Sequence, residues 1–122
     1  ATLDSVCYQT RDLLRAMRND GAPVPDTLRV DGGMVRNDWL MQRLADLTGS
    51  PVERGLLPET TALGAAFLAG LGAGLYASTE EIAELWSGAG RFEPTLAAKE
   101  RDSAYAGWQD AVSRTLTRPG TP

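Results

Sequence analysis

The chain has 122 residues, of which 43% are hydrophobic, and it carries a net charge of −4 with no histidine and one cysteine, Cys7. This length suits one globular domain or a piece of a larger one, and the missing histidine excludes histidine-dependent triads, zincin motifs and histidine pH switches within these residues. One cysteine excludes an intrachain disulfide and favours a reducing, cytoplasmic setting, while arginines interleaved with acidic residues leave no basic stripe for nucleic acid.

The first predicted element is a helix over residues 3–18, where apolar side chains recur at spacings of three and four. The face expected to be buried carries Val6, Thr10, Leu13, Leu14 and Met17, and the face expected to be exposed carries Arg11, Asp12, Arg15 and Arg18. The helix should end at Gly21, which favours a left-handed cap, ahead of Pro23. Because the chain opens with Ala1 rather than Met just before this helix, we expect it to be part of a longer protein.

A short strand is predicted over residues 28–30, and it leads into Asp31-Gly32-Gly33. A second helix follows over residues 37–48, with a stripe formed by Leu40, Leu44 and Leu47. Gly49 and the nearby Pro51 should end this helix. The stretch PVERG, residues 51–55, is a candidate for a second short strand.

Residues 60–79 form the longest uncharged run of the chain, close to the roughly 20 residues that span a bilayer. The run consists mainly of alanine and glycine, and it lacks an aromatic belt and flanking basic residues. It therefore predicts a buried helix of a water-soluble protein, beginning at Thr60 or Thr61 and weakened near its end by glycines. No signal-peptide pattern precedes it at the N-terminus.

The last third of the chain predicts two helices separated by a loop or edge strand. Ser78 and Glu81 form a capping-box pattern for a short helix through Trp86, and GRFEP, residues 90–94, is the loop or edge strand. A long helix over residues 96–116 should turn inward Ala104, Tyr105, Trp108, Val112 and Leu116. Residues 119–122 are expected to be a disordered tail. The order of elements predicts an α/β fold whose two or three short strands need further strands beside them.

The Asp31-Gly32-Gly33 turn is the candidate functional feature. Two glycines between a strand and a helix expose backbone N–H groups without side chains to obstruct a ligand, and Asn37 can cap the helix or offer its amide to a nucleotide. The pattern lacks the third glycine of a dinucleotide fingerprint and the lysine of a P-loop. By spacing alone, a tight turn with Asn37 as a plain cap is the favoured interpretation, and a nucleotide site is the alternative.

The acidic residues predict neither a catalytic base nor a metal site within this chain. Asp31 could act as a general base or hold a magnesium-bound water, but an aspartate at this place commonly accepts backbone hydrogen bonds in the turn. No second carboxylate lies near it in sequence. Solvated surface positions are expected for the other candidates, Glu53, Glu59, Glu80, Glu81 and Glu84.

Eight stretches, in this order, resemble the C-terminal end of the FGGY carbohydrate kinase family, particularly its glycerol-phosphorylating members. They are YQTRDLL, LRVDGG followed by Asn37, LMQ, ADLTG, PVER, TALGAAFLAGL, FEP and YAGWQDAV. The resemblance extends from about Ser5 to Leu116, and one visible departure is Gly55, where the family usually has proline after VER.

The resemblance implies that residues 1–118 form the C-terminal portion of an actin-like, ribonuclease-H-like ATPase domain, with few short strands and about five helices. It implies an ATP/ADP site in which Gly33 contacts the nucleotide through its backbone, Asn37 contacts the adenosine and Gly32 shapes the turn. Mg²⁺, the glycerol contacts and the catalytic base would belong mainly to a preceding, missing part of the enzyme. The full-length enzyme would be a cytoplasmic homo-oligomer that transfers the γ-phosphoryl group of ATP to glycerol, and this segment alone should be inactive.

Two alternatives stay open at this point. A related FGGY kinase acting on a pentulose or tetritol would carry its substrate contacts outside this segment. A non-catalytic module could bind a nucleotide or a protein partner through the same turn.

Overall fold

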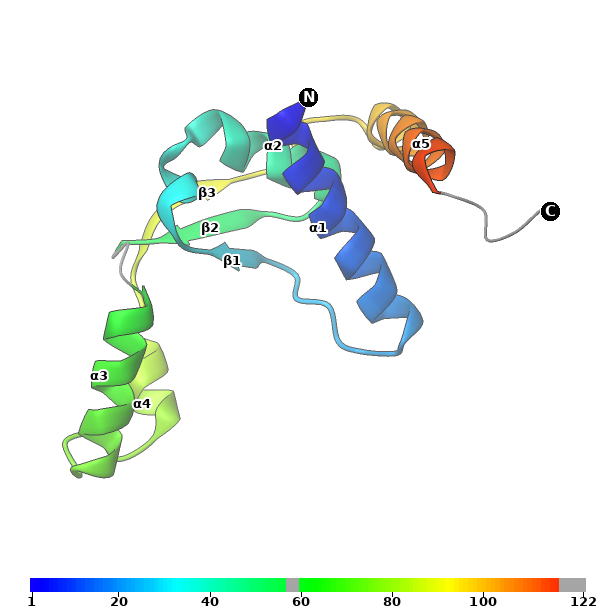
Figure 1. The fold of residues 1–122 in the computed structure, drawn as a ribbon. Coiled ribbons are helices and arrows are strands. Elements are labelled where there is room, and N and C mark those ends of the chain that lie inside the picture. Colours follow the sequence, from blue (N-terminus) through cyan, green and yellow to red (C-terminus); the bar gives the residue numbers. More distant parts are fainter. Residues whose placement is uncertain (57–59, 117–122) are drawn as a thin grey trace.

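The computed structural model describes residues 1–56 and 60–116 (Figure 1). In chain order its elements are α1 Thr2–Asn19, β1 Leu28–Val30, the 3-10 helix η1 Gly33–Arg36, α2 Asp38–Thr48, β2 Val52–Gly55, α3 Thr60–Gly72, α4 Thr79–Glu84, β3 Gly88–Phe92 and α5 Ala98–Thr115. This arrangement confirms the predicted α/β fold of few short strands and five α-helices. The predicted disordered tail, residues 119–122, lies outside the described residues.

The three strands form one sheet in the order β1-β2-β3. β1 and β2 are parallel, with Val30 opposite Arg54, and β3 runs antiparallel to β2 with Phe92 opposite Val52. The parallel pair requires a crossover, which α2 supplies. The first three residues of the GRFEP stretch thus lie in an edge strand, which begins earlier than expected, at Gly88, and ends at Phe92, before Glu93 and Pro94.

The core lies where α1 and α2 pack against each other and cover one face of the sheet. The predicted stripe on α2 is confirmed, because Leu40, Leu44 and Leu47 are all buried. Val52 of β2 and Cys7 of α1 are fully buried beside them. Burial raises the pKa of the Cys7 thiol to about 11, so this cysteine packs as a small apolar side chain at neutral pH.

α1 differs from its predicted pattern of buried and exposed faces. Leu14 is buried as expected, but Leu13 is 60% exposed, and Arg11 and Asp12 lie against α5 instead of facing solvent. The spacing of apolar residues identifies the helix face that packs on the main core. It cannot identify a second packing contact that is made by polar side chains. Leu116 is also corrected, since it is 68% exposed beyond the end of α5.

Asp12 joins α1 to α5 across more than ninety residues of sequence. Its carboxylate accepts a hydrogen bond from the Trp108 indole N–H at 2.8 Å and another from the Tyr105 hydroxyl. Burial, together with the hydrogen bond from its hydroxyl to Asp12, raises the pKa of Tyr105. The Tyr8 ring stacks on Trp108 with centroids 5.3 Å apart, so the predicted anchors of the last helix do contact the body of the molecule.

Arg11 forms a second connection to the same helix. Its guanidinium donates to the Arg101 carbonyl at 3.1 Å and pairs with Asp102 at 2.6 Å, and it lies 4.1 Å from the centre of the Tyr105 ring. Charge-assisted bonds and a cation–π contact therefore hold α5 where apolar burial is sparse.

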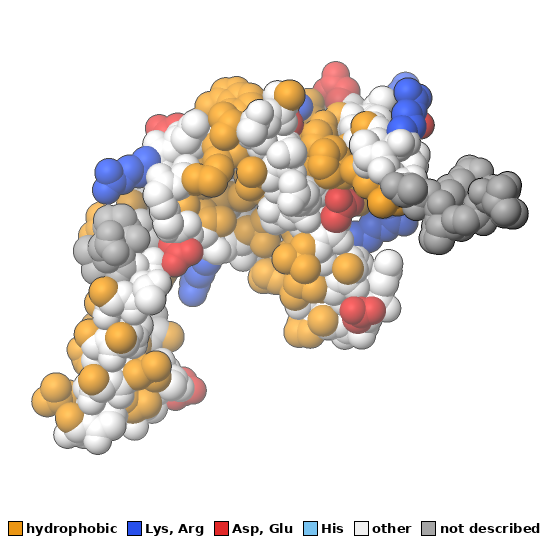
Figure 2. Space-filling view, in the orientation of Figure 1, with side chains coloured by type: hydrophobic (Ala, Val, Ile, Leu, Met, Phe, Trp, Pro, Cys, Tyr) orange, Lys and Arg blue, Asp and Glu red, His pale blue; other side chains and the backbone are white. Residues whose placement is uncertain are grey.

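α3 and α4 project away from the sheet (Figure 1). The Phe67 ring meets Tyr76 edge-on, and a Cβ atom at Gly70 would come within 2.7 Å of the Tyr76 ring. Several other apolar side chains of this part are exposed, including Leu68 at 67% and Leu75 at 76%, and Figure 2 shows hydrophobic side chains over its surface. The predicted burial of this helix is therefore wrong for the described residues, because three short strands give too little surface to cover a helix that is apolar on all sides.

The other two predictions for this region concern membrane crossing and capping. Within residues 1–56 and 60–116, no helix is both long enough and apolar enough to cross a membrane. The Ser78 hydroxyl accepts from the Glu81 N–H, as the capping box predicts, whereas the Glu81 carboxylate accepts from Ala77 N–H instead of Ser78 N–H. α4 ends at Glu84, two residues before the predicted end at Trp86.

Asp46 on α2 holds the segment that enters α5. One carboxylate oxygen accepts from the Thr95 N–H at 2.7 Å, the Leu96 N–H at 3.1 Å, and the Thr95 and Gln42 side chains. Burial acts to raise the pKa of Asp46, but these hydrogen bonds outweigh it and the pKa is lowered. The ionised carboxylate is therefore the form that the folded protein prefers.

Replacing Asp46 by asparagine should lower the free energy of unfolding by about 1 kcal/mol at pH 7. Because the pKa is lowered in the folded state, the wild-type advantage is fully present above the ordinary carboxyl pKa of about 3.9 and is lost as the pH falls through the lower folded-state value. Urea unfolding at pH 7 and near pH 3 checks this, with the exposed Asp26→Asn as control. An equal difference at both pH values would contradict the assignment.

Candidate functional site

The predicted turn lies at the carboxyl end of β1 and leads through η1 to α2. Gly32 has φ 91° and ψ 177°, a backbone conformation that is essentially restricted to glycine. The turn continues with a hydrogen bond from the Val35 N–H to the Gly32 carbonyl at 3.2 Å. Gly32 is therefore required by the shape of the turn itself.

Gly33 has no such internal requirement. Its φ is not positive, and a Cβ atom built on it would meet no atom within 4 Å. The residue is exposed, and its N–H donates to no acceptor among residues 1–56 and 60–116. Within the described chain, neither packing nor conformation explains a glycine at this position, whereas a ligand approaching the backbone would.

Asn37 is the N-cap of α2, as the sequence predicts. Its side-chain oxygen accepts from the Leu40 N–H at 3.1 Å, and its own N–H donates to the Met34 carbonyl at 3.1 Å. The capping bond uses only the oxygen of the amide. The amide NH₂ group makes no hydrogen bond within the described residues, and the exposed side chain can donate to a ligand at the same time as it caps the helix.

Two contacts of Val35 join the turn to the core and to β2. The Val35 side chain is 7% exposed and belongs to the core, and the Val35 carbonyl accepts from the Arg54 guanidinium at 3.0 Å. Arg54 also pairs with Asp38, the first residue of α2, at 2.5 Å. From the sequence, Arg54 is predicted only as a strand residue without a functional role, although the matched stretch PVER contains it.

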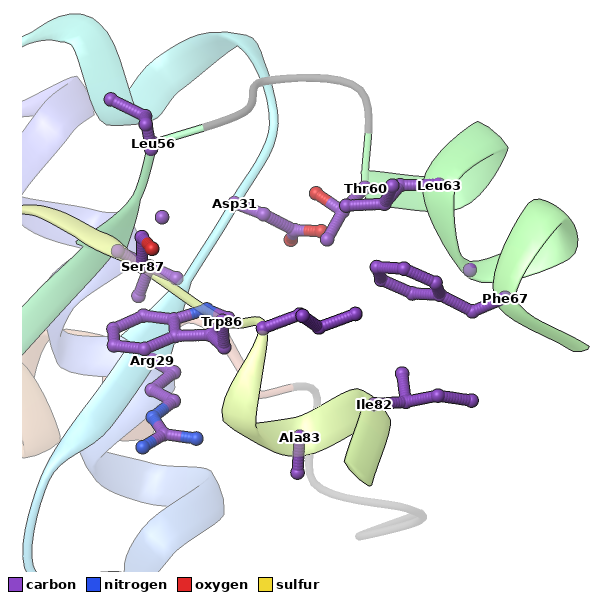
Figure 3. A pocket seen from close by; sticks show the side chains of 14 residues that line it. Arg29, Asp31, Leu56, Thr60, Leu63, Phe67, Ile82, Ala83, Trp86 and Ser87 are labelled. Atoms are coloured by element: carbon purple, nitrogen blue, oxygen red, sulfur yellow. The ribbon is translucent and has the colours of Figure 1, made fainter. Parts of the chain in front are cut away.

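A pocket of about 600 Å³ adjoins this turn, between the carboxyl ends of β1 and β2 and the helices α3 and α4. Figure 3 shows side chains from the sheet and from both helices around it, including Asp31, Thr60, Phe67, Ile82 and Trp86. Such an edge of a parallel strand pair commonly binds ligands. Gly32, Gly33 and Asn37 do not line this pocket, although Asp31 does, so the pocket and the turn are neighbouring surfaces.

Asp31 is exposed and accepts no hydrogen bond from the described residues, so the prediction that it accepts backbone hydrogen bonds in the turn is wrong. Its side chain points into the pocket, toward Thr60, instead of back over the turn (Figure 3). The Thr60 hydroxyl, also at the pocket, is buried without a partner in the described part of the chain.

The remaining acidic residues of the described chain do not gather at one site. Glu53 pairs with Arg91 on β3 and lies 3.8 Å from Arg29 on β1, and Glu59 is outside the described residues. Within the described ranges, no group of three or more His, Cys, Asp or Glu side chains is placed to hold a metal ion. The geometry therefore offers a surface for a polar ligand at the turn, and the described residues provide no metal-binding cluster.

Comparison with known proteins points to one family. The sequence model for the C-terminal domain of the FGGY family of carbohydrate kinases matches residues 1–73. A glycerol kinase of Ectopseudomonas mendocina is 60% identical over 114 residues, which cover 93% of this chain and 23% of that protein. A glycerol kinase of Brucella ovis is 55% identical over 121 residues, covering 98% of this chain and 24% of that protein. The chain thus spans about a quarter of the length of these curated relatives.

Solved structures agree on the fold. A crystal structure of Plasmodium falciparum glycerol kinase with ADP matches with a TM-score of 0.80 and 30% sequence identity, over 95% of this chain and 23% of that one. Gluconate kinase from Lactobacillus acidophilus matches with a TM-score of 0.74 at 20% identity, a likeness that concerns the fold alone.

Proposed function

The chain belongs to the FGGY family of carbohydrate kinases, and from this premise we propose that it is the C-terminal, nucleotide-side part of an ATP-dependent glycerol kinase. The observation that carries the proposal is the 60% identity to a glycerol kinase over 93% of the chain. The complete enzyme would convert ATP and glycerol to ADP and glycerol 3-phosphate. Residues 1–118 would be the C-terminal portion of its second domain.

The turn is the part of this chain that would hold the nucleotide. Gly33 would approach it through its backbone N–H, Asn37 would donate its amide NH₂ to the adenosine portion, and Gly32 would give the turn its shape. The open space at Gly33 and the unused amide group of Asn37 support this assignment. A structural relative described with ADP supports the choice of ligand.

The chemical step would depend on groups outside this segment. The catalytic base, the glycerol contacts and the main Mg²⁺ ligands are proposed to lie in the three-quarters of the relatives' length that this chain does not span. Phosphoryl transfer depends on positioning both substrates together, so the segment alone should bind nucleotide weakly and turn over no glycerol. We further propose a cytoplasmic homo-oligomer with roles in glycerol metabolism and without nucleic-acid or membrane partners, on the basis of composition and family resemblance.

A substrate panel tests the proposed function. The full-length protein containing this segment, supplied with MgATP, should phosphorylate glycerol with a kcat/KM at least about tenfold above that for xylulose, erythritol or gluconate, a difference of about 1.4 kcal/mol in transition-state binding. Residues 1–122 expressed alone serve as the control and should show no turnover.

Each alternative has its own outcome in the same panel. A preference for a pentulose, a tetritol or gluconate would replace glycerol by another acceptor within the family. ADP binding without phosphorylation of any acceptor would indicate a non-catalytic nucleotide-binding module. Turnover by the isolated segment would overturn the division of roles proposed here.

A further inference from the structure

We infer that Arg54 is a positioning residue for nucleotide binding, acting through the turn that carries Gly33 and Asn37. This inference rests on the proposed function, because it assigns the turn to the nucleotide. Arg54 lies on β2 opposite Val30, the last residue of β1 before the turn. Its guanidinium leaves the strand on the side of α2 and donates to the Val35 carbonyl at 3.0 Å and to the Asp38 carboxylate at 2.5 Å.

These two contacts hold the middle and the C-terminal end of the segment from Gly33 to Asn37, which would meet the nucleotide. Val35 belongs to η1, and Asp38 is the residue directly after Asn37. A 3-10 helix of four residues is too short to be stable from its own hydrogen bonds. Its conformation must therefore come from tertiary contacts, and in the described chain the buried Val35 side chain and the Arg54 bond both cross from η1 to other elements.

β3 is built to hold the Arg54 side chain in this position. A Cβ atom at Gly90 would lie 3.1 Å from the Arg54 Nε, so the glycine leaves the space that the guanidinium occupies. The guanidinium carbon lies 5.4 Å from the centre of the Phe92 ring. The Arg54 side chain is 24% exposed, so its bond to the Val35 carbonyl forms in a partly desolvated slot where polar interactions are stronger than on an open surface. The Asp38 side chain is 71% exposed, so the ion pair itself is solvated and contributes less.

Loss of this side chain should loosen the turn without altering any group that touches the substrates. Apparent affinity falls in proportion to the fraction of molecules in the binding-competent conformation. If the ordered turn drops to about one tenth of the population, the Kd for ADP rises about tenfold. The glycerol site would be unaffected, because its contacts lie outside this segment.

The test uses the full-length protein with Arg54→Met and Arg54→Lys. Arg43→Met is the matched control, because Arg43, on α2, also pairs with an aspartate, Asp4 at 2.8 Å, and has a similar exposure of 29%. We expect Arg54→Met to raise the KM for ATP and the calorimetric Kd for ADP about tenfold, with kcat and the KM for glycerol within twofold of wild type. Arg54→Lys retains the charge on a shorter stem and should recover part of the loss.

The outcomes separate this inference from the proposed function. Unchanged ADP affinity in Arg54→Met, while Gly33→Val binds ADP poorly, overturns the positioning role and leaves the nucleotide site in place. An equal loss in Arg43→Met, or a parallel change of kcat and both KM values, shows a general structural role and also overturns it. If the wild-type protein binds no ADP, the proposed function fails, and this inference fails with it.

Discussion

Replacing Gly33 by valine is expected to weaken ADP binding by the full-length protein at least about tenfold, equivalent to about 1.4 kcal/mol, without lowering its stability. The backbone at Gly33 is not in the left-handed region, and an added Cβ meets nothing within 4 Å of the described chain. The fold should therefore accept the side chain. A nucleotide in contact with the backbone would be displaced by it, because the two would occupy the same space.

Calorimetry with ADP and a thermal unfolding curve for each variant check this expectation. Gly107→Val is the matched control, since Gly107 lies on α5 and also has open space around its Cβ position. Unchanged ADP affinity in Gly33→Val would mean that Gly33 does not contact the nucleotide and that the turn has a structural role alone. That result would return the interpretation to the one favoured by spacing alone.

Asn37 allows a second, independent probe of the same contact. Asn37→Ala removes both the cap and the amide donor, and loss of the cap alone costs about 1 kcal/mol. Asn37→Ser keeps an oxygen that can cap α2 but has no NH₂ group. Weaker ADP binding in the serine variant, with the stability of wild type, would separate the ligand contact from the cap.

Replacing Asp12 by alanine is expected to detach α5 from α1 in a fraction of molecules. The change leaves the Trp108 indole N–H and the Tyr105 hydroxyl without their acceptor. Tyr105 is only 6% exposed, so water has little access to its hydroxyl. Hydrogen bonds to a charged group contribute about 1.5–3 kcal/mol each, and a loss of about 2 kcal/mol allows for water entering the gap. Local opening of α5 should then be about thirtyfold more frequent.

Hydrogen exchange of the α5 backbone amides measures this opening directly. Asp110→Ala is the control, because Asp110 forms an exposed pair with Arg114 on the same helix, and such pairs contribute little. Equal exchange in the two variants would show that Asp12 is not what holds α5. Exchange in α2 should stay at the wild-type rate in both.

The fold was predictable where it depends on local pattern. The stripe of Leu40, Leu44 and Leu47 gave the helix and its buried face, because residues three and four apart share one side of a helix. Asn37 and Gly49 marked its two ends, and the structure has a side-chain cap at the first and a left-handed residue at the second. These signals act over a few residues and need no knowledge of the rest of the chain.

Contacts between distant segments were not predictable in this way. Arg11 and Asp12 sit beside apolar residues on a helix and look like solvent-facing charges until α5, some ninety residues later, is brought against them. Burial of the helix over residues 60–72 was predicted from its apolar composition. The described chain lacks a surface large enough to cover it, and most of its residues, Leu68 among them, are at least partly exposed.

The sequence by itself determined the α/β order of elements, the family and the position of the Asp31-Gly32-Gly33 turn, because short motifs in a fixed order identify all three. Only the tertiary structure showed that Gly32 is needed for the backbone conformation and that Gly33 is not. Only the tertiary structure showed that Arg54 contacts the turn. It can do so because β2 places Arg54 opposite Val30 and because Gly90 leaves space for its side chain. The physical reason is that dihedral angles, open space and long-range hydrogen bonds exist only once distant parts of the chain are packed together.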